Sequence, residues 1–115
     1  MGRYIQIRVS ASTFAPDEAE KSFPRLYAAA WPAPEYSPAD RKGLLELVDQ
    51  LGEMTEFGDM PKEAKAVLHK ELPAVAARKR EVEAALADWK PAEAENLSSR
   101  LEEALADLEA RMPAA

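Results

Sequence analysis

A single alternating stretch near the N-terminus, residues 3–12, constrains the fold most, because it is the one convincing β-strand in a chain that otherwise predicts helix. Ile5, Ile7 and Val9 alternate there with polar residues, which is the period-two pattern of a half-buried strand. A lone strand leaves backbone N–H and C=O groups unpaired, so it needs a partner. No other segment alternates in this way. We therefore expect the partner to be an irregular stretch such as residues 33–36, or the same strand of a second copy.

The composition favours one folded domain with a small core. The chain has 115 residues and a net charge of −6, and Leu, Ile, Val and Phe together contribute only 22 residues. We expect a single domain over residues 1–115, in which residues 1–58 hold the strand, two helical segments and the aromatic core, and residues 59–112 form a helical hairpin. A chain with so few large apolar residues is often completed by self-association.

Three aromatic residues, Phe23, Tyr27 and Trp31, lie four positions apart and so share one face of the helical segment that follows Asp17. Pro24 either starts a second helix there or kinks a continuous one. The aromatic stripe has two interpretations. It packs on the strand and on the next helix to form the core, or it lines a hydrophobic groove for a partner. Phe23, Tyr27 and Trp31 are therefore the candidate partner-binding residues.

The middle of the chain predicts a third helical segment. Ser37 followed by Pro38 is typical of a helix start, because serine caps the first turn and proline tolerates its first position. Apolar residues continue at helical spacing from Leu44 to Met54, and Gly58 suits the end of the helix.

Two longer helices, about 61–89 and 92–111, follow and are joined by a short link, which favours an antiparallel hairpin. The first carries an apolar seam at 4-3 spacing that ends at Trp89 and includes Lys79 at one seam position. Pro73 predicts a kink in this helix. The fold class is therefore mainly α, a bundle of about four helices with one N-terminal β-strand and a C-terminal antiparallel helical hairpin.

The charged residues of these helices predict local ion pairs rather than a site. The basic run Arg78–Arg80 cannot form one patch, because consecutive helical residues point about 100° apart. Spacings of three and four residues predict these pairs within the helices: Arg78 with Glu81, Arg80 with Glu83, Lys79 with Glu83, and Asp107 with Arg111.

The residue inventory excludes most catalytic chemistry. The chain has no cysteine and one histidine, His69, which lacks metal-ligating neighbours at helical spacing. Its four glycines are scattered and form no phosphate-binding loop. We therefore predict no catalytic residue, no cofactor, no metal site and no small-molecule ligand, and we predict that the protein is not an enzyme. No stretch is long and apolar enough for a membrane span, so we expect a cytoplasmic protein.

An alternative comes from residues 5–10, Ile-Gln-Ile-Arg-Val-Ser, which are followed by helices and resemble the opening of ribbon-helix-helix repressors and antitoxins. The resemblance implies a dimer that lays a two-stranded ribbon in the major groove of DNA, with Tyr4, Gln6 and Arg8 facing the bases. The chain departs from this family at Pro24 and in its proline-rich link, and its acidic N-terminal helices are poorly suited to phosphate. These departures argue against nucleic acid as a partner.

The sequence thus favours a non-enzymatic protein–protein interaction or assembly module. We expect it to self-associate, as a homodimer paired through Ile5, Ile7 and Val9 and through helical surfaces, or to bind another protein. The ribbon-helix-helix-like DNA-binding regulator is the alternative.

Overall fold

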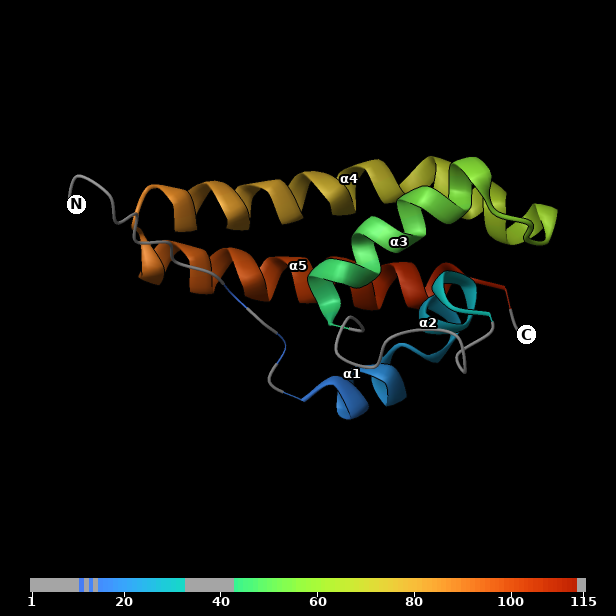
Figure 1. The fold of residues 1–115 in the computed structure, drawn as a ribbon, viewed down its shortest axis with the longest axis horizontal. Coiled ribbons are helices and arrows are strands. Elements are labelled where there is room, and N and C mark those ends of the chain that lie inside the picture. The colour runs from blue at the N-terminus through green and yellow to red at the C-terminus, as the bar shows by residue number, and fades with distance from the viewer. Residues whose placement is uncertain (1–10, 12, 14, 33–42, 114–115) are drawn as a thin grey trace, which may run out of the picture.

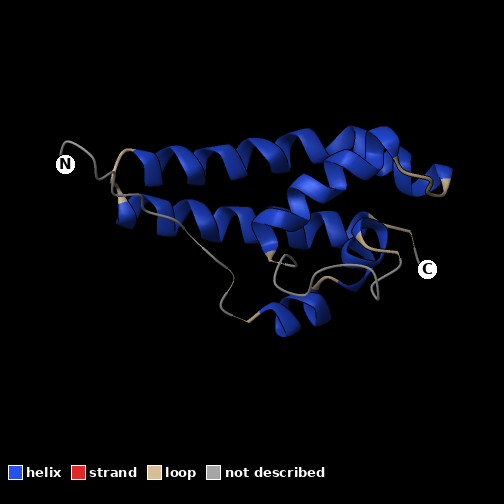
Figure 2. Cartoon of the chain, viewed as in Figure 1, coloured by secondary structure: helices blue, strands red, loops and turns tan. Residues whose placement is uncertain are grey.

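A computed structural model describes residues 11, 13, 15–32 and 43–113. These residues form five helices, which are α1 (Pro16–Ser22), α2 (Pro24–Ala30), α3 (Leu44–Phe57), α4 (Lys62–Ala87) and α5 (Pro91–Arg111) (Figure 1). The described part of the chain contains no strand (Figure 2). The prediction of a mainly helical fold is therefore confirmed. The strand predicted for residues 3–12 lies outside the described residues apart from Ala11.

The two longest helices, α4 and α5, run side by side as an antiparallel hairpin, and the three shorter helices gather at one half of it (Figure 1). Helix α3 packs on α4, and α2 fits between α3 and α5. Phe23, directly before Pro24, is not helical and separates α1 from α2. Because proline lacks the N–H that a helix interior requires, it suits the first position of α2, and two helices form instead of one kinked helix.

Helix α3 begins at Leu44, and Ser37 and Pro38, which predict an earlier start, lie outside the described residues. The backbone of Gly43 is extended, with φ −77° and ψ 172°, so the helix of the described chain starts at Leu44. The side chain of Thr13 takes the capping role, because its Oγ1 accepts a hydrogen bond of 2.7 Å from the backbone N–H of Leu44. The cap thus comes from a residue 31 positions earlier, which no local sequence pattern indicates.

Helix α4 continues without interruption through Pro73, which is exposed, and the kink at this proline stays a prediction. The predicted seam is buried at four positions, Leu68, Leu72, Val75 and Val82. The expectation that it extends to Trp89 is wrong. Trp89 lies beyond the end of α4, has a left-handed φ of 59° and is 59% exposed.

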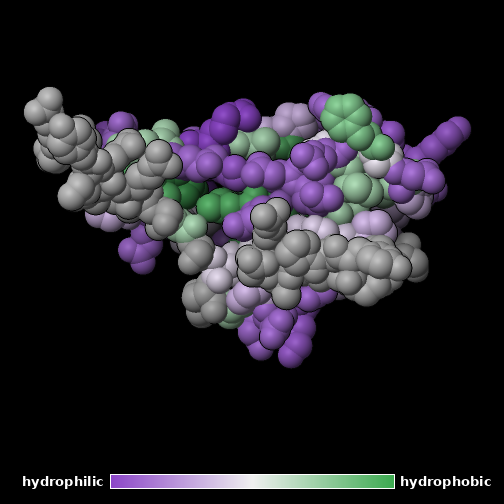
Figure 3. Space-filling model, viewed as in Figure 1, coloured by the Kyte–Doolittle hydropathy of each residue, from purple (hydrophilic) through white to green (hydrophobic). Residues whose placement is uncertain are grey.

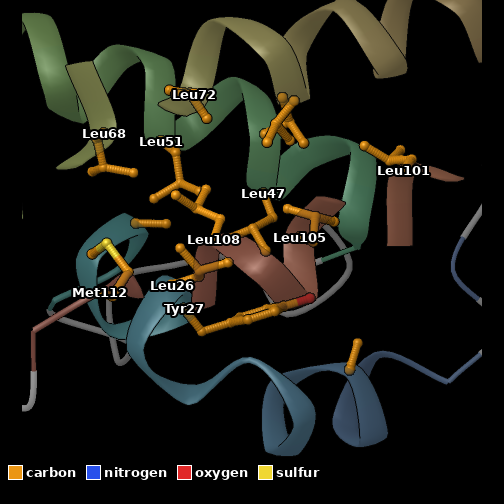
Figure 4. Close-up of a cluster of buried hydrophobic side chains, with 14 of the residues drawn as sticks. Leu26, Tyr27, Leu47, Leu51, Leu68, Leu72, Leu101, Leu105, Leu108 and Met112 are labelled. Atoms are coloured by element: carbon orange, nitrogen blue, oxygen red, sulfur yellow. The ribbon is translucent and has the colours of Figure 1, made fainter. Parts of the chain in front are cut away.

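The core joins both halves of the chain. Leucines from four helices meet in one cluster, and the most deeply buried are Leu26, Leu47, Leu51, Leu68, Leu105 and Leu108 (Figure 4). Tyr27 is buried among them, and its burial, with Glu20 and Glu46 nearby, raises the pKa of its hydroxyl to about 12.

One acidic side chain attaches α2 to the hairpin. The carboxylate of Glu109, on α5, accepts hydrogen bonds from the backbone N–H groups of Arg25 (3.2 Å) and Leu26 (2.9 Å), in the first turn of α2. A carboxylate is well suited to this place, because a helix N-terminus has unpaired N–H groups and a partial positive charge. The Arg25 guanidinium adds a hydrogen bond of 2.8 Å to the backbone oxygen of Met112. The end of α5 therefore acts as the cap of α2.

We predict that Glu109→Ala lowers the free energy of unfolding by about 1–2 kcal/mol, because two backbone N–H groups lose a charged acceptor. Water cannot easily replace this acceptor, because the Glu109 side chain is only 14% exposed. Chemical denaturation followed by circular dichroism measures this. Glu102→Ala, at an exposed glutamate of the same helix, is the matched control and should change stability by less than about 0.5 kcal/mol. Equal effects of the two substitutions would contradict the capping role.

Candidate functional site

The aromatic stripe faces largely inward. Tyr27 is buried in the core, and Phe23 and Trp31 are half-buried and pack against it. The rings of Tyr27 and Trp31 lie 5.4 Å apart between centroids and are tilted by 40°. A partner-binding role for these three residues stays a prediction. Residues 4–9, which include the predicted strand-pairing and DNA-contacting side chains, lie outside the described residues.

An apolar groove lies between α3 and α4, with a volume of about 180 Å³. Its lining comes from both helices and consists of Gly52, Thr55, Glu56, Leu68, His69, Leu72, Pro73 and Ala76. We call it the α3–α4 groove. Sequence reasoning missed it, because its residues belong to two helices and only their packing brings them together.

The groove exists because small or short residues stand where larger ones would fill the space. A Cβ atom added at Gly52 would meet nothing within 4 Å. Glycine in the middle of a helix destabilises it by about 0.5–1 kcal/mol relative to alanine. Helix α3 therefore carries a residue that is unfavourable for the helix and leaves the groove open.

The floor of the groove suits apolar side chains. Leu68 and Leu72 are buried beneath it, and the Thr55 hydroxyl is occupied, because it donates a hydrogen bond of 2.7 Å to the backbone oxygen of Leu51. His69 is exposed at the edge. The described residues hold no cluster of three or more His, Cys, Asp or Glu side chains that could bind a metal ion. The apolar floor of the groove can therefore accept part of a protein surface.

An ion-pair network lies where α3 and α4 approach beyond the groove. The Lys79 ammonium is 3.2 Å from a carboxylate oxygen of Asp49 on α3 and 2.9 Å from one of Glu83. Burial by itself would lower the pKa of Lys79, but the bonds to Glu83 and Asp49 outweigh it and raise the pKa above its usual value. The predicted pair of Arg78 with Glu81 is also present, at 3.5 Å. Arg111 does not follow its prediction, because it pairs with Glu71 on α4 at 2.8 Å instead of with Asp107.

The tip of the hairpin presents a second unusual feature. The N–H of Lys90 bonds to the Ala85 oxygen (2.9 Å) and the N–H of Trp89 to the Leu86 oxygen (3.1 Å). This pair of bonds is the Schellman motif, whose left-handed position normally holds glycine. Trp89 occupies that position here, and its side chain is largely exposed. At the tip, as at Gly52, the residue present is less favourable for the local backbone than another residue would be: glycine would adopt the left-handed conformation of Trp89 without strain.

Comparisons of the chain with protein-family models, with curated proteins and with solved structures gave no significant match. Among the helices described, none is both long and apolar enough to cross a membrane. On the face drawn in Figure 3, hydrophilic side chains predominate and hydrophobic ones appear in separate small patches.

We predict that Gly52→Ala raises the free energy of unfolding by about 0.5–1 kcal/mol, because it improves the helix and its methyl group enters open space. Gly58→Ala is the control with the opposite sign. A Cβ at Gly58 would lie 2.7 Å from the backbone oxygen of Met54, so this change should destabilise the protein. Denaturation of both variants provides the measurement, and a destabilised Gly52→Ala variant would show that the groove is not open at this point.

A comparison of Trp89→Gly with Trp89→Ala isolates the backbone conformation at the hairpin tip. Both changes remove the indole, but only glycine adopts a left-handed φ without strain, so the glycine variant should be the more stable by about 1 kcal/mol. In the interior of α4, Ala84→Gly serves as the control and should lose about 0.5–1 kcal/mol. If Trp89→Gly is no more stable than Trp89→Ala, the left-handed turn is absent in solution.

Proposed function

We propose that this chain is a non-enzymatic protein–protein interaction module whose α3–α4 groove receives apolar side chains of a partner protein. The observation that carries the proposal is Gly52, which faces open space in the middle of α3 at a position where alanine would be more stable. A local choice that lowers stability is expected at functional sites, where activity and stability compete.

The shape and chemistry of the groove support a protein partner over a small molecule. A site for a drug-sized ligand typically has a volume of about 300–1,000 Å³ and several converging polar groups. The groove is smaller than this, at about 180 Å³, and the Thr55 hydroxyl is already bonded to its own helix. An apolar hollow between two helices, with charged side chains beside it, is the arrangement expected of a surface that receives one or two side chains of a partner.

Site-specific photo-crosslinking in cells tests the proposal. A benzophenone amino acid replaces His69, which is exposed at the edge of the groove, and in a second variant it replaces Ala110, an exposed residue of α5 that does not line the groove. We expect the position-69 variant to form a discrete crosslinked protein species, identified by mass spectrometry as another protein or as a second copy of this chain. The species should be absent at position 110.

Gly52→Leu combined with the position-69 crosslinker provides the matched test of the groove itself. The leucine side chain fills the open space beside Gly52, so the crosslinked species should fall at least tenfold while the circular dichroism spectrum is retained. Identical crosslinking patterns at positions 69 and 110, or a pattern unchanged by Gly52→Leu, would contradict the proposed function.

A further inference from the structure

The two helices that form the groove carry opposite charge. Helix α3 contains four acidic residues and no basic one. In residues 62–80 of α4, six basic side chains stand against two acidic ones. The groove is therefore bounded by an acidic helix on one side and a basic helix segment on the other.

The acidic edge runs along α3. Asp49, Glu53 and Glu56 are spaced by four and three residues and so form a stripe on one face of that helix, and all three are exposed. Asp49 contacts Lys79 across the groove end, whereas no ion pair within the described part of the chain uses Glu53 or Glu56. These two carboxylates are available to a partner.

The basic edge runs along α4 in the same way. Lys62, Lys65 and Arg80 share the face of α4 that also carries the groove residues Pro73 and Ala76. Lys62 and Arg80 are exposed and Lys65 is half-buried, and none of the three has an ion-pair partner among the described residues. The basic edge is longer than the acidic edge, at about 27 Å from Lys62 to Arg80 against about 10 Å from Asp49 to Glu56, and its side chains are likewise available to a partner.

A surface with one acidic edge and one basic edge is complementary in charge to a second copy of itself. A two-fold axis along the groove places α3 of one copy over α4 of the other, and the reverse contact follows by symmetry. Because Asp49 lies level with Lys79 in each copy, this arrangement sets Asp49 opposite Arg80 of the second copy, and Glu53 lies about 6 Å further along the same edge. Rotation about an axis across the groove would instead place α3 on α3 and bring like charges together.

We propose that the occupant of the α3–α4 groove is a second copy of this chain, docked groove to groove about this two-fold axis. The inference rests on the proposed function and names its partner. Apolar surface is available for the contact, because Pro73 is exposed in the groove and Phe57, the residue after Glu56, is 85% exposed. Self-association also fits a chain with only 22 large aliphatic and phenylalanine residues.

A charge-swap experiment on the full chain tests this arrangement. One variant, Glu53→Lys/Glu56→Lys, makes both edges basic, and the other, Lys65→Glu/Arg80→Glu, makes both edges acidic. Size exclusion with light scattering at about 50 mM salt measures the mass, which is 12.7 kDa for one chain. The wild type should approach twice this mass as concentration rises. Each variant alone should dimerise at least tenfold more weakly, and their equimolar mixture should recover the double mass.

The outcomes separate this inference from the proposed function. A wild type that stays monomeric up to millimolar concentration overturns the second copy as occupant, whereas crosslinking of position 69 to a different protein would still uphold the interaction module. Variants that dimerise as tightly as the wild type show that another surface, such as the predicted N-terminal strand, pairs the chains, and this also overturns the inference. Gly52→Leu tests the contact without altering charge and should weaken the dimer at least tenfold.

Discussion

The contact between Glu109 and the first turn of α2 is the interaction on which the rest of the arrangement depends. It joins residues more than 80 positions apart and satisfies backbone N–H groups that would otherwise lie unpaired at a partly buried helix end. With α2 fixed on α5, Leu26 and Tyr27 complete the core beneath α3. Helix α3 can then pack on α4 and form one side of the groove.

Two residues depart from the choice that would give the greatest local stability. Gly52 weakens the middle of α3 and leaves open space, and Trp89 occupies a left-handed turn position suited to glycine. Each departure exposes a distinct surface, an apolar hollow at Gly52 and a large aromatic side chain at Trp89. Such conflicts between local stability and the observed residue are expected where a protein functions, and they direct attention to the groove and the hairpin tip.

The sequence predicts those features that depend on local spacing. The end of α3 at Gly58 and the bounds of α5 follow from proline, glycine and apolar periodicity, and Pro24 predicts either the second helix that is observed or a kink. Features that depend on distant residues are not predictable in this way. Thr13 caps α3, Arg111 pairs with Glu71 on the neighbouring helix, and the groove needs two helices packed together. Trp89 fits the spacing of the seam but lies outside it, because the chain turns at this residue without a glycine.

Amide hydrogen exchange in the wild type and in Glu109→Gln tests the central claim, which is that α5 holds α2 in place and α2 in turn supports α3. The account predicts that protection falls together in α2 and α3 in the variant, whereas the interior of α4 and α5 near Val82 and Leu101 keeps its wild-type protection. Unchanged protection in α3, or an equal loss along the whole hairpin, would contradict it.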